Sequence, residues 1–349
     1  MNVSFAKNLG ALFAKDKSIL AIDVGTSSLK IIQAKREKER AVLETYGELS
    51  VSGYGGTEAG RAAMLVDEKV SQMISDLKKE AGATAHRALI SIPLRYSFIT
   101  TIEMPELSDK ELTEAIQYEA RKYIPIAISD VFLDWWRIPK KETEASGGKK
   151  TVLVLLAAVQ REMIEKHKRI LIGAGLEPVG FEIEVFSTAR VLGGRIRGAY
   201  MLFDIGALST KISIIDQGVT RSVHHVDRAS QAFSLAISQA LGIDFKRAEL
   251  MKRDVGISQR PEAVGIHHTI TPLLDSIFDE ADHLRTTYRR KSGVAVDKAI
   301  LSGGGSLMPG FLDYAIGKLG IEVLLANPLG QFEYPAFLQA AINNISPTF

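Results

Sequence analysis

Two short stretches of this chain carry an aspartate, a glycine and a lysine at identical spacing between apolar runs. The two sets are Asp23, Gly25 and Lys30, and Asp204, Gly206 and Lys211. An apolar run, a tight turn rich in hydroxyl groups and a second apolar run predict a β-hairpin whose turn can bind an anion. In the first copy, the aspartate could hold a hydrated Mg²⁺, the glycine allows a phosphate to approach the backbone, and the lysine could neutralise its charge.

A single turn of this kind is a routine connection between strands, so one copy carries little weight. Two matched copies imply a duplicated domain, with one hairpin from each half facing a shared cleft. A third stretch, residues 298–306, is an apolar run that ends in three consecutive glycines. Alone it could be a flexible turn, but after two such hairpins it predicts a backbone that lies flat against a planar ligand.

Composition limits the classes of function. The chain has 349 residues, which is room for two domains, and it is 46% hydrophobic. Its 43 basic and 41 acidic residues nearly cancel, so nothing in the net charge favours binding to nucleic acid. The absence of cysteine excludes disulfides, thiolate metal sites and cysteine nucleophiles, and it suits a reducing cytoplasm.

The first 17 residues have no uninterrupted apolar core, so they do not read as a secretory signal. Apolar residues at helical spacing predict a short amphipathic helix at 3–15. Two interpretations stay open: the helix packs on its own domain or a neighbour, or it binds weakly to a membrane surface.

The periodicity of the remaining chain predicts a division into domains. We expect a first domain at 18–93 and 184–198, to which the C-terminal helix at about 333–349 returns, and a second at 199–332 with a mostly helical part at 228–295. Residues 94–183 read as a compact α+β insert, in which Ser108 opens a helix with a capping box and 142–150 form an exposed hairpin loop. Long helices are predicted at 58–81 and at 262–291, the latter with a break at Pro272.

The insert also contains the adjacent pair Trp135 and Trp136, shortly after the apolar residue Ile126. Neighbours on a strand point to opposite faces, so the two indoles cannot enter one core. Either one packs on the insert and the other on the adjoining domain, or one lines a groove that takes an extended peptide.

The ordered set of motifs resembles the actin-like ATPase superfamily, and more closely the PilM family, the cytoplasmic actin-like proteins of type IV pilus assembly. The stretches that carry the resemblance are residues 21–30, 114–125, 203–206, 248–252, 303–306 and 327–328. The resemblance implies an α/β fold of duplicated actin-like (ribonuclease H-like) domains around a nucleotide cleft, with the α+β insert of the FtsA-like branch.

The resemblance also implies roles for individual residues. Asp23 and Asp204 would hold Mg²⁺ through water, Asp204 and Glu184 would serve any hydrolysis, and Lys211 receives no role. The residues implied to contact ATP or ADP are Gly25, Thr26, Ser27, Ser28, Lys30, Gly206, Ser209, Thr210, Glu249, Lys252, Gly303, Gly304 and Ser306. From the residues alone, Glu249 and Lys252 could equally form a surface ion pair, and Glu184 could equally be a surface carboxylate.

By this likeness the chain is an ATP-binding cytoplasmic scaffold with slow ATPase activity or none. It would bind the N-terminal cytoplasmic peptide of PilN, partly through Ile126, Trp135 and Trp136, and so sit at the inner membrane. The alternatives are an FtsA-like, self-associating filament protein and a small-molecule kinase of the same superfamily.

Overall fold

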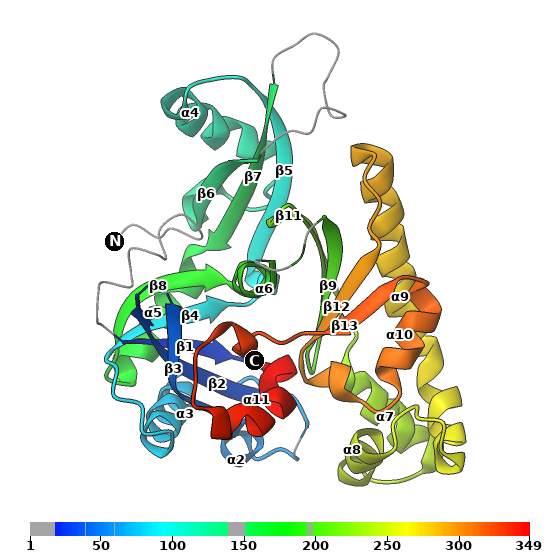
Figure 1. Ribbon diagram of the computed structural model, residues 1–349. Coiled ribbons are helices and arrows are strands. Elements are labelled where there is room, and N and C mark those ends of the chain that lie inside the picture. The colour runs from blue at the N-terminus through cyan, green and yellow to red at the C-terminus, as the bar shows by residue number, and fades with distance from the viewer. Residues whose placement is uncertain (1–17, 39, 59, 139–150, 194–195, 197) are drawn as a thin grey trace.

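The computed structural model describes residues 18–349 except 39, 59, 139–150, 194–195 and 197. The amphipathic segment predicted at 1–17 and the loop predicted at 142–150 lie outside the described residues. In the described part, two five-stranded sheets and one three-stranded sheet form the frame (Figure 1).

The two five-stranded sheets share one topology. The strand orders are β3-β2-β1-β4-β8 and β11-β10-β9-β12-β13. In each sheet the first three strands in chain order form an antiparallel meander. The fourth strand lies parallel beside the first strand, and the fifth lies parallel beside the fourth. The first sheet consists of β1 (Ile19–Val24), β2 (Ser28–Glu37), β3 (Arg40–Ser50), β4 (Arg87–Ile92) and β8 (Glu177–Ile183). The second consists of β9 (Ala199–Ile205), β10 (Thr210–Asp216), β11 (Val219–Val226), β12 (Lys298–Ser302) and β13 (Glu322–Leu325). This repetition confirms the duplicated α/β fold.

Helices α3 (Asp67–Glu80) and α5 (Arg161–Gly173) pack together against the first sheet (Figure 1). The buried side of α3 consists of Val70, Met73, Ile74 and Leu77, the spacing of one face of an α-helix. The prediction of a helix at 58–81 was too long at its N-terminal end. The apolar spacing continues before Asp67, but residues 60–66 form a loop, in which Gly60 has φ +82°.

Helices of unequal length complete the core of the second half. They are α7 (Ser230–Leu241), α8 (Phe245–Asp254), α9 (Val264–Ser292) and α10 (Phe311–Leu319), and α9 is the longest of them. The predicted break at Pro272 is wrong, because α9 runs through it. Ile270 and Leu274, on either side of the proline, are both buried in the second core, so packing holds the helix together where one backbone hydrogen bond is lost.

The insert is smaller than predicted. Its sheet, in the order β5-β7-β6, consists of β5 (Ser97–Pro105), β6 (Val131–Ile138) and β7 (Thr151–Gln160), with α4 (Asp109–Glu119) opened by the predicted capping box at Ser108. The prediction placed 161–183 in this insert, but β8 pairs with β4 in the first sheet and α5 packs on α3. The apolar faces of these two elements complete the first core, which the sequence pattern alone does not specify.

Two further helices join the halves. Helix α6 (Glu184–Gly193) contacts β4 and β8 of the first sheet and β10 and β11 of the second (Figure 1). The chain then returns from the second sheet to the first: Glu333 bonds to the backbone of β3, and Ile342 of α11 (Gln339–Ile345) packs with Leu43. A short helix, α2 (Ser52–Gly55), follows β3. Within the described part of the chain, no helix combines the length and hydropathy needed to cross a bilayer.

Candidate functional site

The two Asp-x-Gly turns are built alike and face one cavity. The N–H of Gly25 donates to Ser28 O at 3.0 Å, and the N–H of Gly206 donates to Ser209 O at 3.1 Å. A Cβ atom on Gly25 would lie 2.7 Å from Ser28 O, so this closed turn needs glycine. The cavity has a volume of about 1090 Å³ and lies between the two sheets. Both turns therefore offer backbone and hydroxyl groups to the same space.

Most of the predicted site residues line this cavity. They are Asp23, Gly25, Thr26, Ser27, Ser28, Lys30, Glu184, Asp204, Gly206, Ser209, Glu249, Lys252, Gly303 and Gly304. Gly303 follows β12 with φ +85°, and a Cβ there would lie 2.5 Å from Ile205 O, so the glycine loop packs directly on the second turn. The next residue, Gly304, is exposed and has nothing within 4 Å of an added Cβ.

Thr210 and Ser306 were predicted to contact nucleotide, but the structure does not bring their side chains to the cavity. Thr210 is buried and its hydroxyl donates to Arg228 O at 2.8 Å. Ser306 is buried and its hydroxyl donates to Gly303 O at 2.7 Å. Each hydroxyl holds backbone next to a cavity-lining turn, because a buried hydroxyl needs a partner.

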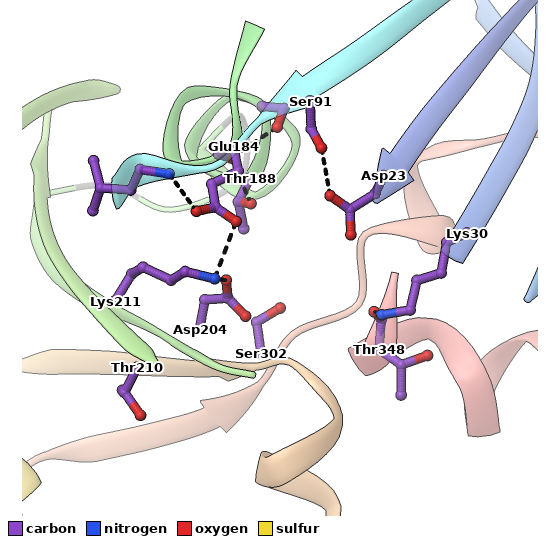
Figure 2. Close-up of polar contacts among 12 residues, drawn as sticks. Asp23, Lys30, Ser91, Glu184, Thr188, Asp204, Thr210, Lys211, Ser302 and Thr348 are labelled. Carbon is purple, nitrogen blue, oxygen red and sulfur yellow. Dashed lines mark hydrogen bonds and ion pairs between the residues drawn. The ribbon is translucent and has the colours of Figure 1, made fainter. Parts of the chain in front are cut away.

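Lys30 lies in the cavity wall but turns away from Asp23 (Figure 2). Its ammonium donates to the backbone carbonyl of Thr348 and lies 5.9 Å from the ring centre of Phe349. Nearby, the N–H of Gly303 donates to Pro347 O at 2.8 Å. The C-terminal residues thus connect the first hairpin to the glycine loop, and the lysine predicted to meet phosphate is engaged in that connection.

Lys211, which received no role from the sequence, lies between two carboxylates (Figure 2). Its Nζ is 3.0 Å from Glu184 Oε2 and 3.0 Å from Asp204 Oδ2. The other Glu184 oxygen accepts the N–H of Leu94 at 2.7 Å. Burial raises the pKa of Glu184 although Lys211 opposes the shift, and burial of Lys211 is outweighed by Asp204 and Glu184, which raise its pKa.

In the first hairpin, the corresponding aspartate, Asp23, is bonded by a serine and not by a lysine. The hydroxyl of Ser91, at the end of β4, donates to Asp23 Oδ1 (Figure 2). The equivalent position in the second sheet is Ser302, which pairs in register with Asp204. Sequence reasoning missed both serines, although Ser302 is the last residue of β12 and Ser91 is the second-last residue of β4, the apolar strand that follows the hairpin in its own half.

The two aspartates predicted to hold Mg²⁺, Asp23 and Asp204, differ in how well they suit a metal. The described residues contain no group of three or more Asp, Glu or His side chains that could hold a metal ion. Asp23 keeps one oxygen outside its bond to Ser91, which suits a metal held through water. On the opposite side, the ammonium of Lys211 lies between Asp204 Oδ2 and Glu184 Oε2, so a metal ion shared by these two carboxylates does not fit.

Glu249 and Lys252 form a buried ion pair, not the surface pair that was the alternative. Glu249 Oε2 lies 2.6 Å from Lys252 Nζ and accepts the hydroxyl of Ser234, while Oε1 lies 2.6 Å from Arg253 Nε. Burial raises the pKa of Glu249, but Lys252, Ser234 and Arg253 together outweigh burial and hold that pKa below its ordinary value. Burial lowers the pKa of Lys252 despite the pairing with Glu249.

A segment of the first half, residues 60–63, reaches across to this ion pair; we call it the cross-cleft strap. Gly60 lies against the Glu249 carboxylate, and the N–H of Ala62 donates to Gln231 Oε1 on α7 at 2.6 Å. The N–H of Ala63 donates to Thr26 O in the first turn at 2.9 Å. The strap therefore links the first turn to the helices of the second half.

The three residues predicted to bind a partner lie on the insert. Ile126 is 40% exposed. Trp135 packs with the core of the insert, whereas Trp136 packs with the first core, its ring 5.1 Å from that of Phe186 in an edge-to-face contact. Both indoles are half-buried, so β6 forms a seam between the insert and the first half.

A protein-family sequence model described as "Type IV pilus assembly protein PilM" matches residues 21–343. Among solved structures, a PilM–PilN type IV pilus biogenesis complex aligns with a TM-score of 0.78 and 24% identity over 95% of each chain. The ethanolamine utilization protein EutJ from Carboxydothermus hydrogenoformans aligns at 0.53 and 17%, over 90% of this chain and 86% of its own. MreB5 of Spiroplasma citri bound to AMPPNP aligns at 0.51 and 16%, over 95% and 99%. These likenesses confirm the actin-like fold.

Proposed function

This chain belongs to the PilM family of type IV pilus assembly proteins, and from that membership we propose that its cleft binds ATP or ADP. The observation that carries the proposal is the pair of matching Asp-x-Gly turns that face one cavity beside a glycine loop. The MreB5 relative with the same fold was solved with a nucleotide analogue, which supports the same ligand class here.

In the proposed complex, Gly25 and the hydroxyl residues Thr26, Ser27 and Ser28 surround the phosphates from one side. Gly206 and Ser209 surround them from the other, since their turn mirrors the first. The adenosine lies near Gly303 and Gly304, with Glu249 and Lys252 at its edge. Asp23 holds Mg²⁺ through water, and the bound ion neutralises phosphate charge.

We propose slow ATP hydrolysis or none. A general base must reach the attacking water, and both carboxylate oxygens of Glu184 already accept from other groups, Leu94 N–H and Lys211. Nucleotide then acts chiefly as a structural ligand: at 100 times its dissociation constant it stabilises the fold by about 2.7 kcal/mol.

The binding test uses two glycines with open space around an added Cβ atom, Gly304 in the cleft and Gly317 in α10. Gly304→Leu places a side chain in the part of the cavity proposed to hold the adenosine, so ATP–Mg²⁺ affinity measured by calorimetry should fall at least tenfold, about 1.4 kcal/mol. Gly317→Leu carries the same new side chain outside the cavity and should bind like the wild type. Equal ATP affinity in both variants and the wild type would contradict the placement of the nucleotide.

We further propose that the insert contributes to binding the N-terminal cytoplasmic tail of PilN, which places the protein at the inner membrane from the cytoplasmic side. The structural relative solved as a PilM–PilN complex supports this partner. The exposed apolar residue Ile126 and the seam formed by Trp135 and Trp136 are the candidate contacts. Apolar side chains beside a strand suit an extended peptide.

The partner test compares two exposed isoleucines, Ile126 on the insert and Ile172 on α5, which are 40% and 57% exposed. Ile126→Ser should weaken binding of a fluorescent PilN-tail peptide, measured by anisotropy with ATP–Mg²⁺ present. Ile172→Ser should leave it unchanged. If the peptide binds both variants as it binds the wild type, the insert surface around Ile126 is not the contact.

A further inference from the structure

Lys30 and Lys211 occupy equivalent positions in the duplicated hairpins but have different partners. Lys30 is the cross-strand partner of Asp23, as Lys211 is of Asp204. The first lysine turns to the Thr348 carbonyl, whereas the second stays beside its aspartate. The duplication has therefore kept a lysine ammonium beside the aspartate on one side of the cleft only (Figure 2).

The ammonium of Lys211 also connects the two halves. Glu184 begins α6 directly after the first sheet ends, and Lys211 and Asp204 belong to the second hairpin. The side chains of Lys211 and Glu184 are only 13% and 18% exposed, so their attraction is weakly screened by water. Two carboxylates brought together in a poorly solvated cleft repel each other unless a cation lies between them.

We propose that the Lys211 ammonium is a built-in cation that replaces the divalent metal on the Asp204 side of the cleft. This inference rests on the proposed nucleotide function for its role, but the geometry concerns only the residues of the chain. Lys211 Nζ lies 3.0 Å from one oxygen of each carboxylate, so its ammonium occupies the space between them. Any metal that accompanies a nucleotide is then confined to the Asp23 side.

The arrangement has a consequence for the ligand. A lysine ammonium neutralises charge without offering open coordination positions, so it cannot activate a water as a metal can. It lowers the repulsion between Asp204 and incoming phosphates while keeping Glu184 occupied. The cleft therefore retains a nucleoside polyphosphate with less dependence on divalent cation than a two-aspartate metal site would show.

The direct test measures Mn²⁺ binding by electron paramagnetic resonance, with no nucleotide present. Lys211→Met removes the ammonium and keeps an unbranched apolar stem, so Glu184 and Asp204 become free to share a metal. We expect at least tenfold tighter Mn²⁺ binding than in the wild type. Lys211→Arg, which keeps the charge, should not gain the site, and the double variant with Lys211→Met and Asp204→Asn should lose it.

A second Mn²⁺ measurement keeps Lys211 in place, so it does not depend on whether the Lys211→Met protein folds. Asp204→Asn should leave its Mn²⁺ binding unchanged, because Asp204 holds no metal there. A wild-type Mn²⁺ site that Asp204→Asn abolishes would overturn the proposal, as would equal Mn²⁺ affinity in the wild type and a folded Lys211→Met protein.

Calorimetry with ATP separates this inference from the proposed function. Replacing Mg²⁺ by a chelator should weaken ATP binding to the Lys211→Met protein at least tenfold more than binding to the wild type. An equal dependence on Mg²⁺ in both proteins would overturn the role given to Lys211. No ATP binding to the wild type under any condition would refute the nucleotide function, while the Mn²⁺ measurements would still decide the position of the cation.

Discussion

Gly60 is where the cross-cleft strap meets the buried ion pair, and replacing it by alanine tests whether that contact holds the two halves together. The residue has φ +82°, and an added Cβ atom would lie 2.5 Å from Glu249 Cδ and 2.7 Å from Oε1. Real Cβ atoms do not approach so closely, so Gly60→Ala must displace either the strap or the carboxylate. The carboxylate is held by Ser234, Lys252 and Arg253.

Two terms make up the expected loss of stability. A non-glycine residue at positive φ costs about 1–2 kcal/mol. Moving the Glu249 carboxylate aside breaks at least one hydrogen bond to a charged group, worth about 1.5–3 kcal/mol. The first term can be removed by comparison with Gly56, which has φ +64° and nothing within 4 Å of an added Cβ. The difference between Gly60→Ala and Gly56→Ala should therefore be about 1.5–3 kcal/mol.

The assay is urea unfolding followed by far-UV circular dichroism, on the wild type and both glycine variants. Repeating both changes in a Glu249→Ala background completes the comparison, because removing the carboxylate removes the clash. In that background the two glycine changes should cost the same. If Gly60→Ala costs no more than Gly56→Ala in the wild-type background, the strap does not press on the ion pair and the reasoning is refuted.

The features that the sequence predicted well are local ones. The hairpin turns at Gly25 and Gly206 depend on residues within a few positions of each other, as does the capping box at Ser108. Burial on one face of a helix is also visible as periodicity. The duplication became evident because two local patterns repeat in the same order, and the paired sheets confirm it.

The predictions that the structure corrects share one cause: each residue or strand has several possible partners, and the sequence pattern does not show which one it contacts. Strand β8 has the pattern of a buried strand, but nothing in that pattern states whether it pairs with β4 or with the insert. Lys30 finds its acceptor in Thr348, 318 residues away. Thr210 and Ser306 have hydroxyls that suit a phosphate, yet these hydroxyls donate to backbone carbonyls instead. Lys211 received no role from the sequence, and its position between two carboxylates depends on Glu184, which comes from the other half.

Three further predictions test the site and the packing. Asp23→Ala should weaken ATP–Mg²⁺ binding at least tenfold in calorimetry, about 1.4 kcal/mol, because it removes the carboxylate proposed to orient the hydrated ion; equal titrations of both proteins would exclude that role. Burial lowers the pKa of His167 from 6.5, so the folded chain binds fewer protons there than the unfolded chain, and the stability present above about pH 6.5 is lost as the pH falls. The melting temperature of His167→Gln should accordingly fall less than that of the wild type between about pH 7 and pH 5, and parallel curves would contradict this. Trp136→Ala should cost about 3 kcal/mol, the low end for a large aromatic residue, because the ring is half-buried in the first core and contacts Phe186 edge to face. Trp136→Phe keeps an aromatic ring in the same place and should recover part of that loss. Since Trp135 packs on the insert instead, Trp135→Ala combined with Trp136→Ala should show nearly additive losses in urea unfolding. A loss below about 1 kcal/mol for Trp136→Ala, together with weaker PilN-tail binding, would mean that this indole serves the partner and not the seam between the two cores.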